Sequence, residues 1–227
     1  MLNTDARHAF AWHKRLLQYL QLRKEAADLR VFGAQKKKKR WLLKTPMYLG
    51  MLEDIAIHYP DALVIQTHRS PTEFLGSVAS VHAKMWGAAS DHIDLHGIGK
   101  QQAVLAKNMI NHGMKTRAEW DATGLGLKVV DVHLSELKKD PMNVVAMVYN
   151  ELGMEFSVEA EVAMRKWLGT RQVRHGGHKF TLEDFGLTEQ QVLDDPVFKR
   201  YCNEYGVEGC ARNTGPKHPS ELPPRRW

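Results

Sequence analysis

The sequence contains little cysteine and no long apolar run. Cys202 and Cys210 are the only cysteines among 227 residues, and they form no CxxC pair, so we expect neither a disulfide framework nor a cysteine-based zinc site. No stretch approaches the roughly 18 uninterrupted apolar residues of a membrane helix, and no signal peptide is recognisable. We therefore expect no membrane segment in this chain and take the reducing cytoplasm as its default location, unless an N-terminal targeting or anchor segment is missing.

The composition is that of a globular protein. Hydrophobic residues make up 43% and charged residues 26% of the chain, which disfavours a disordered or fibrous architecture. The length is sufficient for one sizeable core, so we predict a single domain over residues 1–210. Residues 211–227 contain four prolines and no apolar period, which predicts an irregular tail.

The positive charge is concentrated in one short run. The formal net charge is +6, and Lys36–Arg40 supply five positive charges. Such a run is typical of a solvated loop, and it also occurs in short patches that bind nucleic acid. No aromatic residue other than Trp41 adjoins the run, and no known nucleic-acid-binding module is apparent. We therefore expect no nucleic-acid partner, while the oligomeric state stays unknown.

The order of apolar patterns predicts an α/β protein with a short parallel sheet. Short apolar runs that end in polar residues predict three buried strands, at Trp41–Leu43, Ala62–Ile65 and Leu127–Val132. Helical periods or helix signals follow over residues 1–30 (as one helix or two short ones), 47–58, 70–86, 100–120, 141–149, 157–168 and 196–205. Strands joined through a helix are normally parallel, and ligands gather at their carboxyl ends.

One strand end carries the residues of an anion site. Arg69 precedes a predicted helix start, where Ser70 is the expected N-cap, Pro71 the first helical residue and Glu73 the third residue after the cap. The unpaired N–H groups and the dipole of that helix would add to the positive field of Arg69. We therefore predict that this sheet edge binds a multiply charged anion.

Two serines on the same helix complete this predicted site. Ser77 and Ser80 are spaced to share a helix face and to supply hydroxyl donors. The alternative is that Arg69 pairs with a carboxylate, either Glu73 or Asp131, and that the serines are ordinary small helix residues. Spacing alone does not decide between the two interpretations.

Four segments, in order and spacing, resemble the sulfotransferase family. They are WLLKTPMYL at residues 41–49, YPDALVIQTHRSP at residues 59–71, DVHLSELKKDP at residues 131–141 and HKFTLEDFGL at residues 178–187. The resemblance covers about residues 8–206. It implies a three-layer α/β fold, in which helices flank a short parallel sheet as in P-loop NTPases, here incomplete at the N-terminus. It also implies 3′-phosphoadenosine 5′-phosphosulfate as co-substrate, with no metal.

The resemblance assigns a role to each candidate residue. In the family, the residues matching Arg69 and Ser77 hold the 3′-phosphate of the nucleotide, and we place Ser80 beside them. We expect Lys44, with Thr45, to contact the transferring sulfuryl group. A basic, glycine-containing loop in relatives implies further phosphate contacts from Arg174 and Lys179.

The sequence departs from the family in two places that affect chemistry. No glycine-rich loop for the 5′-phosphosulfate precedes Trp41, and neither Gly99-Lys100 nor Gly124-Leu125-Gly126 has the required spacing. Tyr48 stands where relatives often have a histidine base, and a phenol is a poor base near pH 7 unless a cation such as Lys44 lowers its pKa. A tyrosine that stacks on adenine in cytosolic relatives corresponds to Leu134.

We therefore expect a sulfotransferase-like protein that acts on a hydroxyl or amine of a small-molecule or glycan acceptor, whose identity the sequence does not indicate. One alternative is a catalytically inactive, nucleotide-binding or scaffold copy, and a second is a nucleic-acid-binding protein that uses Lys36–Arg40. The Asp91–His96 segment has imidazole and carboxylate groups at short spacing, but in a chain with 12 histidines we interpret it as a chance cluster rather than a zinc site.

Overall fold

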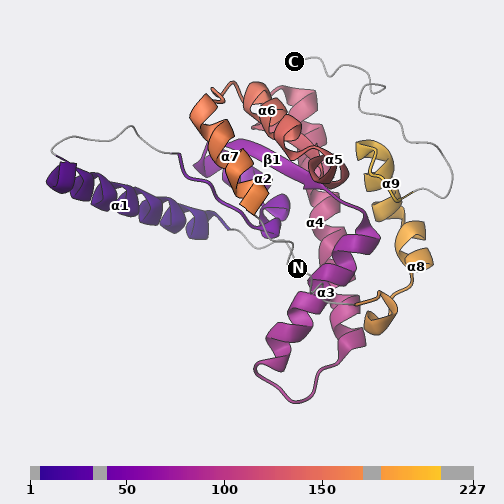
Figure 1. Cartoon of the computed structure of the whole chain (residues 1–227). Coiled ribbons are helices and arrows are strands. Elements are labelled where there is room, and N and C mark those ends of the chain that lie inside the picture. The colour runs from indigo at the N-terminus through magenta and orange to yellow at the C-terminus, as the bar shows by residue number, and fades with distance from the viewer. Residues whose placement is uncertain (1–5, 33–39, 171–179, 211–227) are drawn as a thin grey trace. The chain divides into compact units, whose positions relative to one another are not determined.

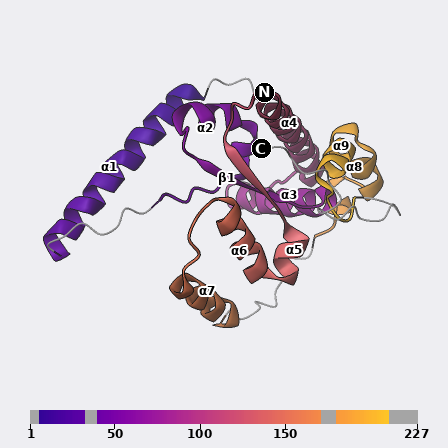
Figure 2. The ribbon, with the colours of Figure 1, turned by 90° about the horizontal axis from the view of Figure 1, so that it is seen from above.

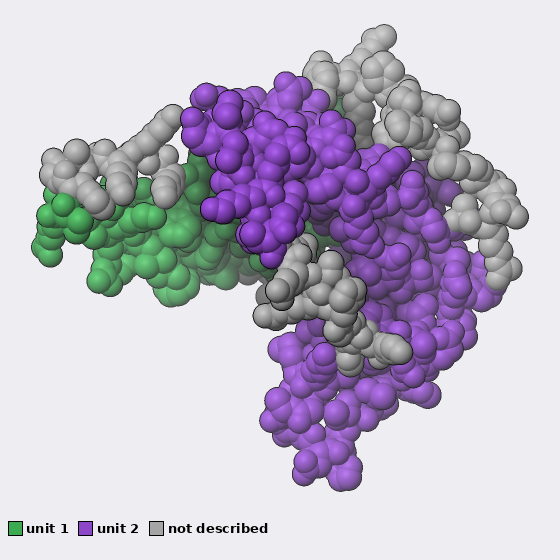
Figure 3. All heavy atoms as spheres, in the orientation of Figure 1, with its two compact units in different colours: residues 1–62, 112–127 green, residues 63–111, 128–227 purple. Residues whose placement is uncertain are grey.

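The computed structural model describes residues 6–32, 40–170 and 180–210. Figures 1 and 2 show its helices and strands as ribbons. The chain forms two compact units, residues 1–62 with 112–127 and residues 63–111 with 128–227 (Figure 3). We describe each unit by itself. The irregular tail predicted over residues 211–227 lies outside the described residues. The single domain expected over residues 1–210 stays a prediction.

The first unit is helical. It contains α1 (Arg7–Phe32), η1 (Pro46–Gly50), α2 (Leu52–His58) and the second part of α4 (Leu95–Thr123). Phe10 on α1 is buried, and its ring lies 5.9 Å from His58 and 6.4 Å from Tyr59. His13 on the same helix is hydrogen-bonded to the Tyr59 hydroxyl at 2.7 Å. These contacts fix α1 to α2. The prediction of an opening helix is confirmed, and it forms one continuous helix rather than two short ones.

The predicted strand at Trp41–Leu43 is wrong. Residues 40–45 form no regular structure, and the three apolar side chains are 48%, 88% and 38% exposed. An apolar run becomes a buried strand only when a neighbouring strand pairs with it and a layer covers it. The sheet of the described residues consists of β1 and β2 alone, and neither pairs with this run. The helix predicted over 47–58 is divided at Met51 into η1 and α2.

The second unit is built on two parallel strands. β1 (Leu63–His68) and β2 (Lys128–His133) pair from Leu63 beside Lys128 to His68 beside His133. α3 (Pro71–Gly87) and α4 connect them. The two strand predictions are confirmed, with β1 extending three residues farther than expected. The prediction of an α/β fold with a short parallel sheet flanked by helices is also confirmed.

Helices cover both faces of this sheet. Val130 and Val132 of β2 pack against Val144 of α6 (Pro141–Glu151). On the opposite face, His68 of β1 is stacked on Tyr205 of α9 (Pro196–Tyr205), with ring centroids 4.6 Å apart. The remaining helices are α5 (Leu134–Lys139), α7 (Val158–Thr170), η2 (Glu183–Phe185) and α8 (Glu189–Asp194). The sequence patterns predicted α6, α7 and α9 but missed α5 and α8, which are one to two turns long.

The capping box predicted at the start of α3 does not form. Ser70 makes no side-chain cap and instead shares a hydrogen bond of 2.8 Å with Thr72, while Glu73 pairs with Arg69. α3 nevertheless begins at Pro71, as predicted. The fixed φ of proline favours a helix start without a cap.

A disulfide joins Cys202 to Cys210, which the small number of cysteines did not lead us to expect. Left-handed glycines bring the two residues together: Gly206 ends α9 with φ of 61°, and Gly209 has φ of 79°. Residues with side chains rarely adopt such angles. The chain therefore turns back after α9 and returns to its last turn.

No helix within the described residues combines the length and the apolar character needed to cross a membrane.

We predict that the buried face of α3 contributes strongly to the free energy of unfolding, whereas its exposed face does not. Leu75 is 0% exposed, whereas Val81 on the same helix is 53% exposed. Leu75→Ala should lower the free energy of unfolding by about 2 to 5 kcal/mol, and Val81→Ala by no more than about 0.5 kcal/mol. Urea unfolding of both variants measures the difference, and equal midpoints would contradict the assigned packing.

Candidate functional site

Arg69 lies at the junction of strand and helix. It follows the last residue of β1 and precedes Ser70 and Pro71, both of which are buried at the start of α3. The junction thus combines the carboxyl edge of a parallel sheet with the free N–H groups of a 17-residue helix. These are two features that favour a bound anion.

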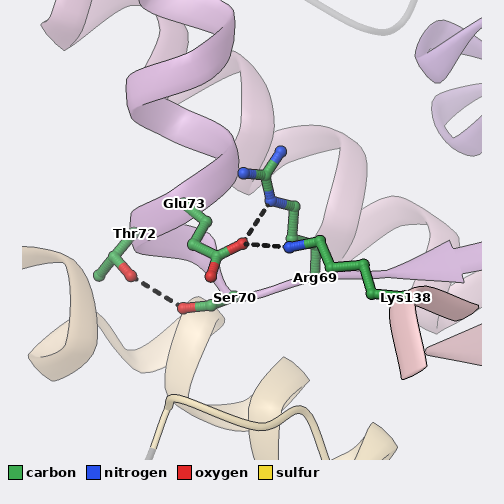
Figure 4. A network of polar contacts seen from close by, with 5 residues as sticks. All are labelled: Arg69, Ser70, Thr72, Glu73 and Lys138. Atoms are coloured by element: carbon green, nitrogen blue, oxygen red, sulfur yellow. Dashed lines mark hydrogen bonds and ion pairs between the residues drawn. The ribbon is translucent and has the colours of Figure 1, made fainter. Parts of the chain in front are cut away.

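The guanidinium of Arg69 pairs with one carboxylate at the surface. Its Nε donates to Oε2 of Glu73 at 2.7 Å, and Nζ of Lys138 lies 3.9 Å from the same oxygen (Figure 4). The arginine and glutamate side chains are 35% and 50% exposed. Figure 4 shows the terminal nitrogens of Arg69 directed away from Glu73. The carboxylate pairing that was the alternative interpretation is therefore present, but it uses Nε and leaves the arginine open to solvent.

The two predicted serines share a helix face with Glu73. Ser77 and Ser80 follow Glu73 by four and seven residues on α3, which places the three side chains on one side of the helix. Ser77 is half-buried and Ser80 is 2% exposed. Ser77 therefore stands one turn from the carboxylate that Arg69 contacts, whereas Ser80 faces the protein interior.

Directly before Arg69 lies a buried polar network that sequence analysis missed. His68 is 1% exposed; its Nε2 lies 2.8 Å from Oδ1 of Asp131 and its Nδ1 lies 3.1 Å from the Tyr201 hydroxyl. The His68 ring is stacked with His133 and Tyr205 as well as with Tyr201. The available signal was the period of two, because Gln66, His68, Asp131 and His133 share one face when β1 continues past its apolar part.

Burial changes the titration of this network. The pKa of Tyr201 is raised far above that of a free tyrosine because the buried phenolate would lose its hydration. Burial, followed by the charge of His68, lowers the pKa of His133. Tyr201 is therefore neutral at physiological pH, and the charged form of the His133 imidazole is disfavoured.

The predicted catalytic residues belong to the first unit, and the nucleotide-binding ones described above belong to the second. Lys44 is exposed before η1, and Thr45 caps this helix by accepting from the backbone N–H of Met47 at 3.3 Å. The ring of Tyr48 lies 6.1 Å from that of Phe10. Burial, and secondarily the nearby Tyr48, raises the pKa of Tyr59.

Several predicted residues lie outside the described residues. These are Arg174, Lys179 and the lysines 36–39 of the basic run. Of that run only Arg40 is described, and it is exposed. Leu134, which takes the place of an adenine-stacking tyrosine, is the first residue of α5.

The Asp91–His96 segment has local structural roles. The carboxylate of Asp94 accepts from the backbone N–H of Gly97 at 2.8 Å, and Ser90 hydrogen-bonds to the backbone of His92. Among the residues whose positions are given, no three histidine, cysteine or acidic side chains are grouped so that they could hold a metal ion.

Parallel strands flanked by helices define an α/β protein, in which the cation Arg69 follows the carboxyl end of the first strand. Residues 5–158, about two thirds of the chain, match the sequence description of the sulfotransferase family. The chain therefore belongs to the sulfotransferase family. A comparison with curated proteins finds no significant match.

Two solved structures resemble this fold. Sulfotransferase STF9 from Mycobacterium avium superposes with a TM-score of 0.74 at 22% sequence identity, over 91% of this chain and 48% of that one. Sulfotransferase STF1 from Mycobacterium tuberculosis H37Rv has a TM-score of 0.57 at 29% identity, over 73% of this chain and 40% of that one. The chain thus spans less than half the length of either solved sulfotransferase.

We predict that Arg69 sets the titration of Glu73. The Arg69 hydrogen bond, aided by the charges of Arg69 and Lys138, holds the pKa of Glu73 below the ordinary 4.5. The small stabilisation from this pair is complete above pH 4.5 and is lost as pH falls through the lowered pKa. In Arg69→Ala, the NMR titration midpoint of the Glu73 carboxyl carbon should rise toward 4.5. An unchanged midpoint would show that the pair does not persist in solution.

Proposed function

We propose that this chain handles 3′-phosphoadenosine 5′-phosphosulfate and transfers its sulfuryl group to a hydroxyl or amine of a small-molecule or glycan acceptor. Membership of the sulfotransferase family supports this class of reaction. The single observation that carries the nucleotide assignment is the position of Arg69, between the carboxyl end of β1 and the N-terminus of α3.

In this proposal Arg69 holds the 3′-phosphate through its terminal nitrogens. The guanidinium fork matches two phosphate oxygens, and such charge-assisted bonds are stronger than neutral ones. The existing pair with Glu73 engages Nε and is exposed, so it offers little competition to a phosphate. Ser77 supplies a hydroxyl one turn along α3, and Ser80 supports the same helix face from inside.

The remaining roles follow from the family motif. Lys44, with Thr45, would contact the transferring group, and Tyr48 would act as the base for the acceptor. Arg174 and Lys179 would add phosphate contacts. Like phosphoryl transfer, the reaction places charge on the equatorial oxygens of the moving group, so positioning and cationic stabilisation supply most of the catalysis.

The proposed transfer breaks one bond to sulfur and forms another, and it calls for no metal ion. The acceptor oxygen or nitrogen attacks sulfur in line with the oxygen that bridges sulfur to the 5′-phosphate. The bond from sulfur to the bridging oxygen breaks, and 3′,5′-adenosine bisphosphate leaves with that electron pair. The acceptor proton passes to the base, for which Tyr48 is the candidate.

A second candidate function is nucleotide binding without catalysis. It is favoured by Tyr48, which stands in place of the usual histidine and whose ring packs beside Phe10. A phenol needs a neighbouring cation to serve as a base near pH 7, and within the described part of the chain no ion pair or hydrogen bond joins Lys44 to it. Both candidates share the nucleotide site, and only transfer separates them.

We predict that Arg69→Ala weakens binding of 3′,5′-adenosine bisphosphate by about ten- to a hundredfold, because a charge-assisted hydrogen bond contributes about 1.5 to 3 kcal/mol. Titration calorimetry measures the affinity. The same substitution should leave the affinity for 5′-AMP within about twofold, since that nucleotide has no 3′-phosphate.

The matched control is Arg165→Ala on α7. Arg165 also forms an exposed i,i+4 pair, with Glu161 at 2.6 Å, so the control removes the same charge and the same kind of contact. Wild-type affinity in Arg165→Ala with weak binding in Arg69→Ala would support the site. No binding by wild type, or equal losses in both variants, would refute it. Binding without transfer of labelled sulfuryl groups to simple phenols, alcohols and amines would favour the non-catalytic candidate.

A further inference from the structure

Tyr201 on α9 connects the C-terminal part of the chain to the end of β1. Its hydroxyl lies 3.1 Å from Nδ1 of His68, the last residue of β1. When the proton of the His68 ring is on Nε2, Nε2–H donates to Asp131 and Nδ1 accepts from the phenol. The hydroxyl therefore holds the residue that directly precedes Arg69.

The network is buried and ordered by stacking. Tyr201 and Tyr205 are buried, and their rings lie 5.7 Å and 4.6 Å from the His68 ring. Buried polar groups are costly unless each is hydrogen-bonded. An apolar residue at position 68 would pack on the same rings without these requirements. The hydrogen bonds of this network thus fix the orientation of the His68 side chain at the end of β1, which packing of hydrophobic side chains alone would not do.

α9 itself is held from two sides. Asp195 caps its first turn by accepting from the backbone N–H of Val197 and forms an ion pair of 3.0 Å with Lys107 of α4. After the helix, the Cys202–Cys210 disulfide returns the chain, and a Cβ on Gly209 would lie 3.7 Å from that of Ser70. Tyr201 therefore projects from a helix that has anchors besides its contact with β1.

We propose that Tyr201 is a positioning residue for the nucleotide phosphate: its hydroxyl fixes His68, and thereby the backbone that leads into Arg69, so that the guanidinium faces the 3′-phosphate. This inference rests on the function proposed above. The arginine side chain is exposed and long, and without a fixed backbone it would sample many rotamers. Holding its backbone lowers the ordering cost of binding, which is the advantage of a preorganised site.

The test is Tyr201→Phe, which keeps the stacked ring and removes only the hydroxyl. Calorimetry should show affinity for 3′,5′-adenosine bisphosphate reduced about three- to tenfold and affinity for 5′-AMP unchanged. Without nucleotide, amide hydrogen exchange at Arg69, followed by NMR, should be at least about tenfold faster than in wild type. Tyr149→Phe on α6, whose ring packs on Phe156 at 4.8 Å, is the matched control and should change neither measurement.

The two measurements separate this inference from the proposed function. If wild type fails to bind 3′,5′-adenosine bisphosphate, the proposed function is wrong, and the Arg69 amide still reports whether Tyr201 holds the backbone. Wild-type exchange at Arg69 in Tyr201→Phe would overturn the inference, as would equal losses of affinity for both nucleotides, which a general loss of structure would cause. If Tyr201→Phe does not fold, Asp131→Ala removes the acceptor of the His68 ring and is examined by the same two measurements.

Discussion

The parallel pairing of β1 with β2 is the constraint on which the rest of the second unit depends. The last pair of this register is His68 beside His133, so the last residues of both strands lie at the carboxyl edge of the sheet. Arg69 directly follows the last residue of β1, and α3 begins two residues later, at Pro71. A shift of the pairing by one residue would turn His68 to the other face of the sheet, away from α9.

Two kinds of polar interaction meet at this edge, and they differ in how firmly they hold. The Arg69–Glu73 pair is exposed, so it contributes about 0 to 1 kcal/mol and can exchange for another anion. The His68–Asp131–Tyr201 network is largely buried, and breaking it would leave polar groups without water or partners. This edge of the sheet therefore combines a buried polar network with a side chain whose partner is replaceable.

The sequence predicted the elements whose signals are local. Pro71 and Pro196 mark helix starts correctly, and apolar runs at residues 63–65 and 129–130 mark both strands. The run at Trp41–Leu43 has the same local signal, but whether such a run becomes a strand depends on a pairing partner, which composition does not specify. The disulfide was missed because two cysteines eight residues apart meet only through the left-handed turns after α9.

Of the candidate site, the sequence specified the local part. Ser77 and Ser80 are close in sequence, so helix spacing placed them on one side of α3, and Glu73 was considered as a partner of Arg69. The His68 network joins residues 63 and 133 positions apart, and it becomes visible only when β1, β2 and α9 are assembled. The motif identified the arginine, but the buried network beside it comes from three separate elements.

A structure of the chain with bound 3′,5′-adenosine bisphosphate would show directly whether Arg69 binds the nucleotide. We expect a terminal nitrogen of Arg69 to lie about 2.7 to 2.9 Å from an oxygen of the 3′-phosphate, with the Ser77 hydroxyl on the same group. A nucleotide bound elsewhere, with Arg69 still paired only to Glu73, would contradict it.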